Sequence, residues 1–296
     1  MTQPRRLVSL SPNVSLILFG LGADESVVGC TQHCLPTIQQ YLKAWHLPEH
    51  AVAQRLQHWA EIPIVAVWPL AEHESIKALK PERILTSGSG PFGVHDAQRF
   101  GVASDALFHF DTRTFADLEQ HIAQIGSLLG KSGEAANLID QVTIKCDEAR
   151  VRQIAHAATP KVLFEYCVCT TYDADPARRI ANPAHTILVG GHLAPEVIQV
   201  GGGESVLMQP GDTAKWVVFD DIRQARPDVI LQYDCHGCPA AKRHPINERH
   251  GWSELPAVDR QAVYSLHENI SDPNLCFPAA LDEVVNVLNL HAARTA

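Results

Sequence analysis

The sequence has no apolar run long enough to cross a membrane and no basic run of the kind that binds nucleic acid. Its longest apolar stretch, Val14–Leu21, is interrupted and falls well short of the roughly 20 residues that a membrane-spanning helix needs. The net charge of −9 argues against a nucleic-acid partner or an anionic membrane surface, both of which favour a basic face. We therefore expect no nucleic-acid partner and no membrane insertion.

The first residues also lack the marks of an export signal. MTQPRRLVSLSPN contains two arginines but no apolar core of about 7–15 residues and no small-residue cleavage site. As written, the sequence predicts a cytoplasmic protein, or a periplasmic one if a leader has been removed. It shows neither a Ser-His-Asp order nor a carboxylate pair that would support an enzyme, and we predict no catalytic residue.

Short apolar strands alternate with helices along the first half of the chain. Strands are predicted at Arg6–Ser9, Ser26–Gly29, Arg83–Leu85 and Ala106–Phe110, and Thr114–Leu129 carries apolar residues at helical spacing. Strands that alternate with helices form parallel sheets. A chain of 296 residues is long for one hydrophobic core, so two domains are expected.

The second half repeats the pattern after a long helix. Residues 132–157 keep apolar side chains at helical spacing with no Gly or Pro linker, and strands resume at Lys161–Glu165, Val229–Leu231 and Ala262–Leu266. The predicted fold is α/β, with two Rossmann-like lobes that have parallel sheets and are joined by one long backbone helix. The predicted boundaries are 1–130 for the first lobe, 131–158 for the helix and 159–296 for the second lobe.

Cysteines gather where strands end. Seven of the eight lie at or just beyond a predicted strand end: Cys30, Cys34, Cys167, Cys169, Cys235, Cys238 and Cys276. Ligands of open α/β sheets bind outside the carboxyl ends of the strands, so these thiols are candidate ligand contacts. Thiolates suit zinc, copper(I) and iron–sulfur clusters, and the spacing of Cys235 and Cys238 lets both sulfurs reach one metal. His33 and His236 are candidate imidazole ligands.

The same cysteines are also compatible with two purely structural roles. Free cysteines are often small core residues, which is the role expected for Cys146 on the long helix. In an exported protein the close pairs could form ordinary disulfides. Our hypothesis is that the thiols surround a metal, a metal cluster or a metal-bearing ligand. Aromatic residues near the same loops are candidates for stacking on a flat ligand: Tyr166, Tyr172, Trp216 and Phe277.

Four segments resemble a known family. RRLVSLSPNVSLILFGLGADESVVGCT, ESIKALKPERILTSG, FDDIRQARPDVILQ and WSELPAVDRQAVYSL are similar to segments of the helical-backbone (class III) ABC-transporter substrate-binding proteins, the vitamin B12 and iron-siderophore type. The resemblance runs from about Arg5 to Leu290. It implies a ligand cleft between the two lobes and one acidic residue per lobe that docks on a membrane permease. By position these residues are Glu74 and Asp220, although the family's usual residue at the second is Glu.

Three functional interpretations follow. The first is a substrate-binding protein that captures a small metal-containing ligand, such as cobalamin, an iron complex or a metal cluster, and that docks on an ABC permease if the chain has such a partner. The alternative is a cytosolic iron–sulfur or metal-cluster protein, acting as a carrier, scaffold or redox enzyme through its cysteines. The third is a vitamin B12 or tetrapyrrole binder in which a histidine such as His33 or His236 reaches the metal axially.

Overall fold

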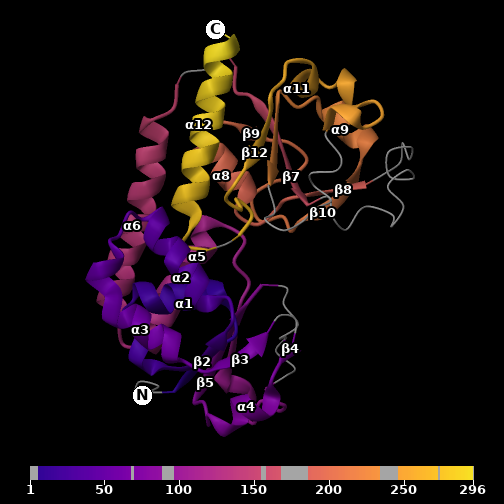
Figure 1. Ribbon diagram of the computed structural model, residues 1–296. Helices are drawn as coiled ribbons and strands as arrows, with labels where there is room; N and C mark the ends of the chain where they lie inside the picture. The colour runs from indigo at the N-terminus through magenta and orange to yellow at the C-terminus, as the bar shows by residue number, and fades with distance from the viewer. Residues whose placement is uncertain are drawn as a thin grey trace. The chain divides into compact units, whose positions relative to one another are not determined.

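The computed structural model describes residues 6–67, 70–88, 97–154, 158–167, 186–233, 246–272 and 274–295, with the backbone alone at 167, 186 and 247. These residues belong to two compact units (Figure 1). Unit 1 comprises Met1–Ile144 and Asn274–Pro278, and unit 2 comprises Lys145–Pro273 and Ala279–Ala296. Within the described ranges, no helix is both long enough and apolar enough to cross a membrane.

Unit 1 is built on a six-stranded sheet in the order β4-β3-β2-β1-β5-β6. Its strands are β1 Leu7–Ser9, β2 Val27–Thr31, β3 Ile64–Val67, β4 Leu70–Ala71, β5 Arg83–Ser87 and β6 Leu107–Phe110. All neighbours pair in parallel except β3 and β4, which are antiparallel. Since β1 lies between β2 and β5, the chain winds outward from β1 in both directions.

Helices lie between the parallel strands, as their connections require, and α5 follows the last strand. They are α1 Pro12–Gly20, α2 Cys34–Ala44, α3 Ala53–Glu61, α4 His73–Ala78 and α5 Phe115–Leu128, with 3-10 helices η1 Asp24–Ser26, η2 Glu49–Val52 and η4 Ser104–Ala106. On one face of the sheet, Ile76 of α4 packs with Val8, Ile84 and Phe100 in a buried cluster. Because neighbouring strand residues alternate between faces, Leu7 and Leu85 face the opposite side and are also buried.

The amphipathic pattern of α5 shows how the sequence sets one helix boundary. Thr114 caps the helix, because its hydroxyl accepts from the backbone N–H of Asp117 at 3.0 Å. The Asp117 carboxylate in turn accepts from the backbone N–H of Thr114 at 3.0 Å, which completes a capping box. Leu118, Ile122 and Ile125 then form the buried stripe, as predicted.

Unit 2 has a mixed six-stranded sheet. Its strands are β7 Lys161–Cys167, β8 Thr186–Val189, β9 Glu204–Ser205, β10 Lys215–Val218, β11 Val229–Tyr233 and β12 Val263–Leu266. The order is β10-β8-β7-β11-β12, and β9 also pairs with β7. The predicted parallel arrangement holds for β7, β11 and β12, whereas β8 is antiparallel to both β7 and β10.

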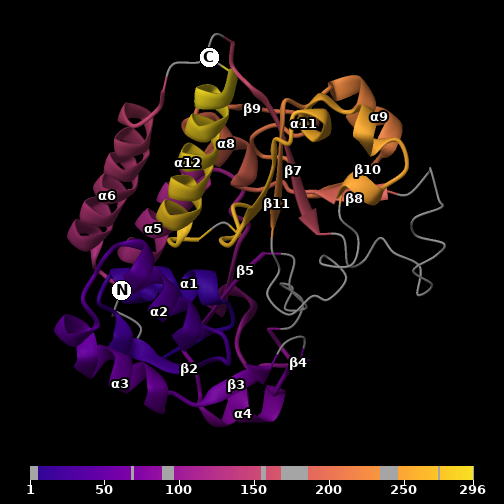
Figure 2. The same ribbon diagram turned by 45° about the horizontal axis from the view of Figure 1, so that its top comes forward.

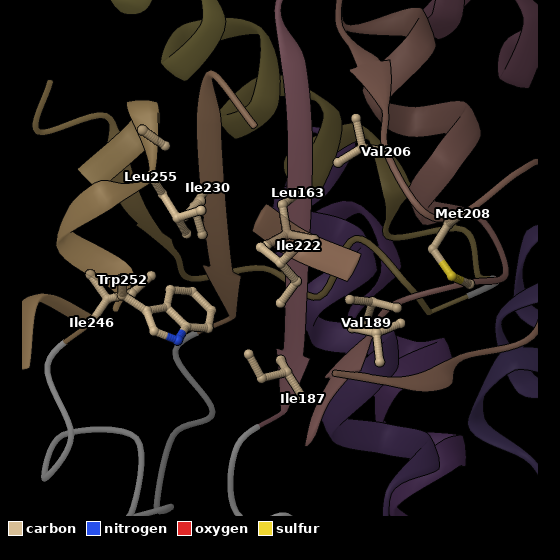
Figure 3. Close-up of a cluster of buried hydrophobic side chains, with 12 residues drawn as sticks. Leu163, Ile187, Val189, Val206, Met208, Ile222, Ile230, Ile246, Trp252 and Leu255 are labelled. Atoms are coloured by element: carbon tan, nitrogen blue, oxygen red, sulfur yellow. The ribbon is translucent and has the colours of Figure 1, made fainter. Parts of the chain in front are cut away.

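Helices cover both faces of the unit 2 sheet (Figure 2). They are α8 Ala194–Val200, α9 Phe219–Ala225, α11 Pro256–Asp259 and α12 Phe277–Thr295, with 3-10 helices η5 Ile246–Glu248 and η6 Trp252–Glu254. Figure 3 shows the core on the α9 and α11 side, where Leu163, Ile230 and Ile222 pack near Trp252. α8 and α12 cover the other face, so both faces of the sheet are buried.

The long helix α6, Ser132–Val151, begins in unit 1 and continues into unit 2. The helix predicted from the sequence extends to residue 157, but α6 ends at Val151. Asn289 of α12 accepts a hydrogen bond from the backbone N–H of Ile154 at 2.8 Å and donates to the backbone carbonyl of Arg152 at 2.9 Å. This side chain satisfies the backbone groups that follow the helix end, so the helical hydrogen-bond pattern need not continue.

Candidate functional site

The candidate site in unit 1 lies where β1 and β5 end. At this point the strand order reverses around β1, which is where open α/β sheets bind ligands. Ser11, which precedes α1, and Ser87, the last residue of β5, have hydroxyl oxygens 2.5 Å apart. Below them, Ser9 donates to the Ser11 carbonyl at 3.1 Å, and Ser15 donates to the Ser9 hydroxyl at 2.9 Å. Ser9 and Ser15 are fully buried and Ser11 is 5% exposed, so Ser87, which is half-buried, is the hydroxyl of this chain nearest to solvent at this edge.

Two of the predicted cysteines lie at the end of β2 and the start of α2 in unit 1. Cys30 lies in β2, and Cys34 is the first residue of α2, where its sulfur accepts from the backbone N–H of Thr31 at 3.3 Å. Both side chains are buried, as are those of Cys146 and Cys276. The Cys276 sulfur lies 3.8 Å from the carbonyl oxygen of Thr37. Cys30 and Cys34 are therefore both enclosed in unit 1.

His33 precedes Cys34 and is exposed. Its Nε2 lies 2.9 Å from the side-chain nitrogen of Gln32, so this ring nitrogen already has a protein neighbour. Within the described ranges, no group of three or more His, Cys, Asp or Glu side chains is placed to hold a metal ion. The metal role of the thiols and of His33 stays a prediction.

The candidate site in unit 2 lies at the carboxyl ends of β7 and β11. Tyr166 of β7 and Tyr233 of β11 stack with their ring centroids 6.5 Å apart and an angle of 15° between the planes. Both rings are half-buried. Tyr166 is one of the predicted stacking residues, whereas Tyr233 is not among them. The signal for Tyr233 is its equivalent position, because Gln232 pairs with Glu165 and the tyrosines follow directly.

A buried ion pair involves Glu165, the residue that directly precedes Tyr166. The Glu165 carboxylate accepts from Nη1 of Arg249 at 2.8 and 2.9 Å, and from the side chain of Gln232 at 2.7 Å. The side chains of Glu165 and Arg249 are 1% and 4% exposed. The Arg249 guanidinium also lies over the ring of Trp252, 4.7 Å from its centroid. This pair, which sequence reasoning missed, holds the ends of β7 and β11 to the segment that contains η5 and η6.

The remaining predicted residues are dispersed. Trp216 lies on β10 and is exposed. Phe277 is buried in unit 1, where its ring meets those of Phe115 and Trp45 edge-on at 5.0 and 6.1 Å. The described structure includes only the backbone of Cys167. Five predicted residues lie outside the described ranges: Cys169, Tyr172, Cys235, His236 and Cys238.

The two candidate docking residues are exposed carboxylates on short helices. Glu74 of α4 is 87% exposed and pairs with Lys77 at 2.7 Å, and the hydrogen bond from Lys77 lowers the pKa of Glu74. Asp220 of α9 is 67% exposed and pairs with Arg223 at 3.0 Å. Asp220 and Glu254 also line a unit 2 pocket of about 500 Å³. Both helices thus present negative charge to solvent.

The fold of this chain is similar to that of known substrate-binding proteins. No protein-family model matches the chain. A curated relative, the uncharacterized ABC transporter substrate-binding lipoprotein YvrC of Bacillus subtilis (strain 168), is 23% identical over 281 residues, covering 92% of this chain and 74% of the relative.

Solved structures match along almost the whole chain. An ABC transporter substrate-binding protein from Listeria monocytogenes EGD-e has a TM-score of 0.69 and 21% identity, covering 97% of this chain and 99% of its own. S. aureus IsdE complexed with heme has a TM-score of 0.70 and 16% identity, covering 96% and 98%. The vitamin B12-binding protein BtuF of Vibrio cholerae has a TM-score of 0.63 and 17% identity, covering 98% of each chain. The resemblance drawn from the sequence and the predicted two-lobed α/β fold are confirmed.

Proposed function

We propose that this chain is the substrate-binding component of an ABC transporter and that its ligand is a small metal-containing complex. The observation that carries the proposal is the match, over more than nine-tenths of the chain, to a heme complex and to a vitamin B12-binding protein. The relative YvrC supports the transporter assignment. Delivery to a permease on the outer side of a membrane, and hence a location outside the cytoplasm, belongs to the same proposal.

The stacked tyrosines favour a flat ligand. Aromatic rings prefer offset or edge-on contacts with other π-systems at centroid distances of about 4.5–7 Å. Tyr166 and Tyr233 already have this arrangement at the strand ends where open sheets bind ligands. The Glu165–Arg249 pair fixes the ends of β7 and β11, so the stacked tyrosine pair is ordered before the ligand binds. A metal-tetrapyrrole has the flat face that this platform would contact.

The comparisons support this function over a cytosolic iron–sulfur or metal-cluster protein. The similar proteins are transporter components and heme- or vitamin B12-binding proteins, which take their metal as part of a ligand. The predicted thiol contacts stay part of the proposal. Cys30 and Cys34 are enclosed in unit 1, so a role in ligand contact would have to be indirect for these two.

Glu74 and Asp220 are proposed as the docking residues for the permease. Their exposure leaves the carboxylates accessible to a basic partner, and charge complementarity raises association rates. Reversal of either charge, by Glu74→Lys or Asp220→Lys, should reduce cellular uptake of the bound complex without weakening its binding to the isolated protein. Glu61→Lys, at the end of α3, is a control that reverses a charge elsewhere on unit 1.

Binding of three metal complexes to the purified protein tests the proposed function. Hemin, cyanocobalamin and a ferric catecholate complex are titrated separately and followed by absorption spectra and by the temperature of unfolding. A ligand present at about 100 times its Kd stabilises the folded state by about 2.7 kcal/mol, which is a measurable shift. The proposed function is contradicted if none of the three complexes changes either signal.

Tyrosine variants locate the ligand. Tyr166→Ala and Tyr233→Ala should each weaken binding at least about fivefold, because loss of one aromatic contact costs roughly 1 kcal/mol beyond the lost area. Tyr264→Ala is the matched control, since Tyr264 lies on β12 and accepts a hydrogen bond from Arg294 at 3.3 Å. Equal losses in all three variants would show that the tyrosine pair has no specific role.

A further inference from the structure

The guanidinium of Arg249 has more donors than its protein partners accept. Its two contacts with the Glu165 carboxylate, at 2.8 and 2.9 Å, both start from Nη1. Nε is buried and has no hydrogen-bond partner, and Nη2 donates to no acceptor within the described ranges. The side chain is only 4% exposed, so bulk water does not surround these groups. The edge of the guanidinium that Nε and Nη2 form is therefore left without an acceptor.

A buried donor without an acceptor is unfavourable, so this free edge points to a missing partner. The edge of a guanidinium matches a carboxylate, which accepts two parallel N–H bonds. Within the described part of the chain, Glu165 is the only carboxylate that pairs with Arg249, and it also accepts from Gln232 at 2.7 Å. Glu165 balances the charge of Arg249 without serving Nε. A carboxylate brought by a ligand fits the free edge.

Arg249 reaches the carboxyl ends of the central strands of unit 2. Its partner Glu165 pairs in register with Gln232 across β7 and β11, and these two residues directly precede Tyr166 and Tyr233. Neighbouring strand residues point to opposite faces, so the Glu165 carboxylate and the tyrosine rings flank the same sheet edge from its two faces. A ligand bound across this edge would meet aromatic rings on one face and the free guanidinium edge on the other.

We propose that Arg249 binds a carboxylate of the ligand through Nε and Nη2. The inference rests on the proposed function and narrows its ligand class to metal complexes that carry free carboxylates. The Trp252 ring lies flat-on to the guanidinium, with its centroid 4.7 Å from Cζ, and leaves the edge open. Glu165 fixes the other side of the guanidinium, so the free edge is oriented before the ligand binds. Arg249 thus selects the ligand by its charge.

Hemin and its dimethyl ester test this inference on the wild-type protein. The two compounds share the metal and the flat ring, but esterification removes the negative charges of the propionate side chains. Each compound is titrated in the same detergent-containing buffer, and the absorption spectrum gives its dissociation constant. We expect the ester to bind at least about tenfold more weakly, because a hydrogen bond to a charged group contributes at least that factor.

Variants separate the guanidinium from its neighbour, and all are measured where they remain folded. The double variant Glu165→Gln with Arg249→Met leaves no buried charge and should bind hemin and the ester equally. Glu165→Gln alone keeps the guanidinium, so it should keep the preference for hemin. A merely structural ion pair would change both dissociation constants together and leave their ratio unaltered. Arg260→Met is the matched control, because Arg260 is a 58% exposed arginine of unit 2, and it should leave the ratio unaltered.

The inference is overturned if wild-type protein binds the ester as tightly as hemin, or if the double variant keeps the preference. It is also overturned if cyanocobalamin or the ferric catecholate complex, neither of which has a free carboxylate, binds more tightly than hemin. In that case the proposed function stands, because a metal complex still binds. Failure of all three complexes to bind contradicts the proposed function itself.

Discussion

The buried Glu165–Arg249 pair should dominate the stability of unit 2. Both side chains are almost fully enclosed, and Glu165 accepts from Arg249 twice and from Gln232 once. Removal of one partner leaves the other charge buried without compensation, which costs about 3–5 kcal/mol. Glu165→Gln should lower the free energy of unfolding of unit 2 by this amount, and so should Arg249→Met.

The double variant distinguishes a true pair from two independent side chains. Glu165→Gln with Arg249→Met leaves neither charge in the interior, so its loss should be smaller than the sum of the single losses by about 2–3 kcal/mol. Hydrogen exchange of the β7 and β11 amides in increasing urea reports on unit 2 specifically. Asp147→Asn is the control, because it breaks an exposed pair with Arg150 and should cost less than about 1 kcal/mol.

One result would refute this reasoning. If the single losses add to within about 0.5 kcal/mol in the double variant, the two side chains do not act as a pair. Binding of hemin or cobalamin to Glu165→Gln is then measured under conditions where the variant remains folded. Weaker binding would further show that the ion pair supports the stacked tyrosines Tyr166 and Tyr233.

Three further outcomes are expected. Asp24→Ala should lower the free energy of unfolding of unit 1 by about 2–3 kcal/mol, measured in urea, because the buried indole N–H of Trp59 loses the carboxylate that accepts its hydrogen bond at 2.6 Å. A decrease below about 1 kcal/mol would contradict this. Burial lowers the pKa of His121. The stability that the neutral imidazole contributes is therefore complete above the unfolded pKa near 6.5 and is lost as the pH falls through the lowered folded pKa. The urea concentration at the unfolding midpoint should decrease when the pH is lowered from about 7.5 to 5, and it should decrease less in His121→Gln. Gly191→Ala should lower the temperature of unfolding, because the added Cβ would lie 2.4 Å from the Asp212 carbonyl oxygen. Gly133→Ala has open space around it and should raise the free energy of unfolding by about 0.4–1 kcal/mol. Similar effects of the two substitutions would contradict the steric argument.

Periodic and capped elements can be predicted from the sequence, whereas elements without such signals cannot. The apolar stripe of α5 and its Thr114 cap are local, so the prediction of Thr114–Leu129 is close to the observed Phe115–Leu128. The sequence does not predict β8 and α8, since their apolar residues lie among glycines that suggest loops. Antiparallel pairing of β8 depends on contacts with β7 and β10 that no local pattern contains.

The candidate site is also predictable only in part, because some of its contacts join residues that are far apart in the sequence. Pro36 suggests a loop around Cys34, yet Cys34 opens α2. Proline is compatible with the first turn of a helix, where backbone N–H groups have no helical acceptor. Glu165 is the overlooked signal in unit 2, because a carboxylate within a buried strand requires a partner. That partner, Arg249, is 84 residues away, so only the folded chain identifies it.

The segment Asn274–Pro278 affects how the protein can be synthesised and divided. It belongs to unit 1, where the Leu275 carbonyl accepts from the Trp45 indole at 2.6 Å and Phe277 packs against Trp45 and Phe115. Domains generally fold from the N-terminus as the ribosome releases them. Here unit 1 needs residues that follow Lys145–Pro273 of unit 2 in the chain before its core is complete. A fragment ending at Ile144 would therefore expose these aromatic rings and depend on chaperones, whereas the full chain covers them itself.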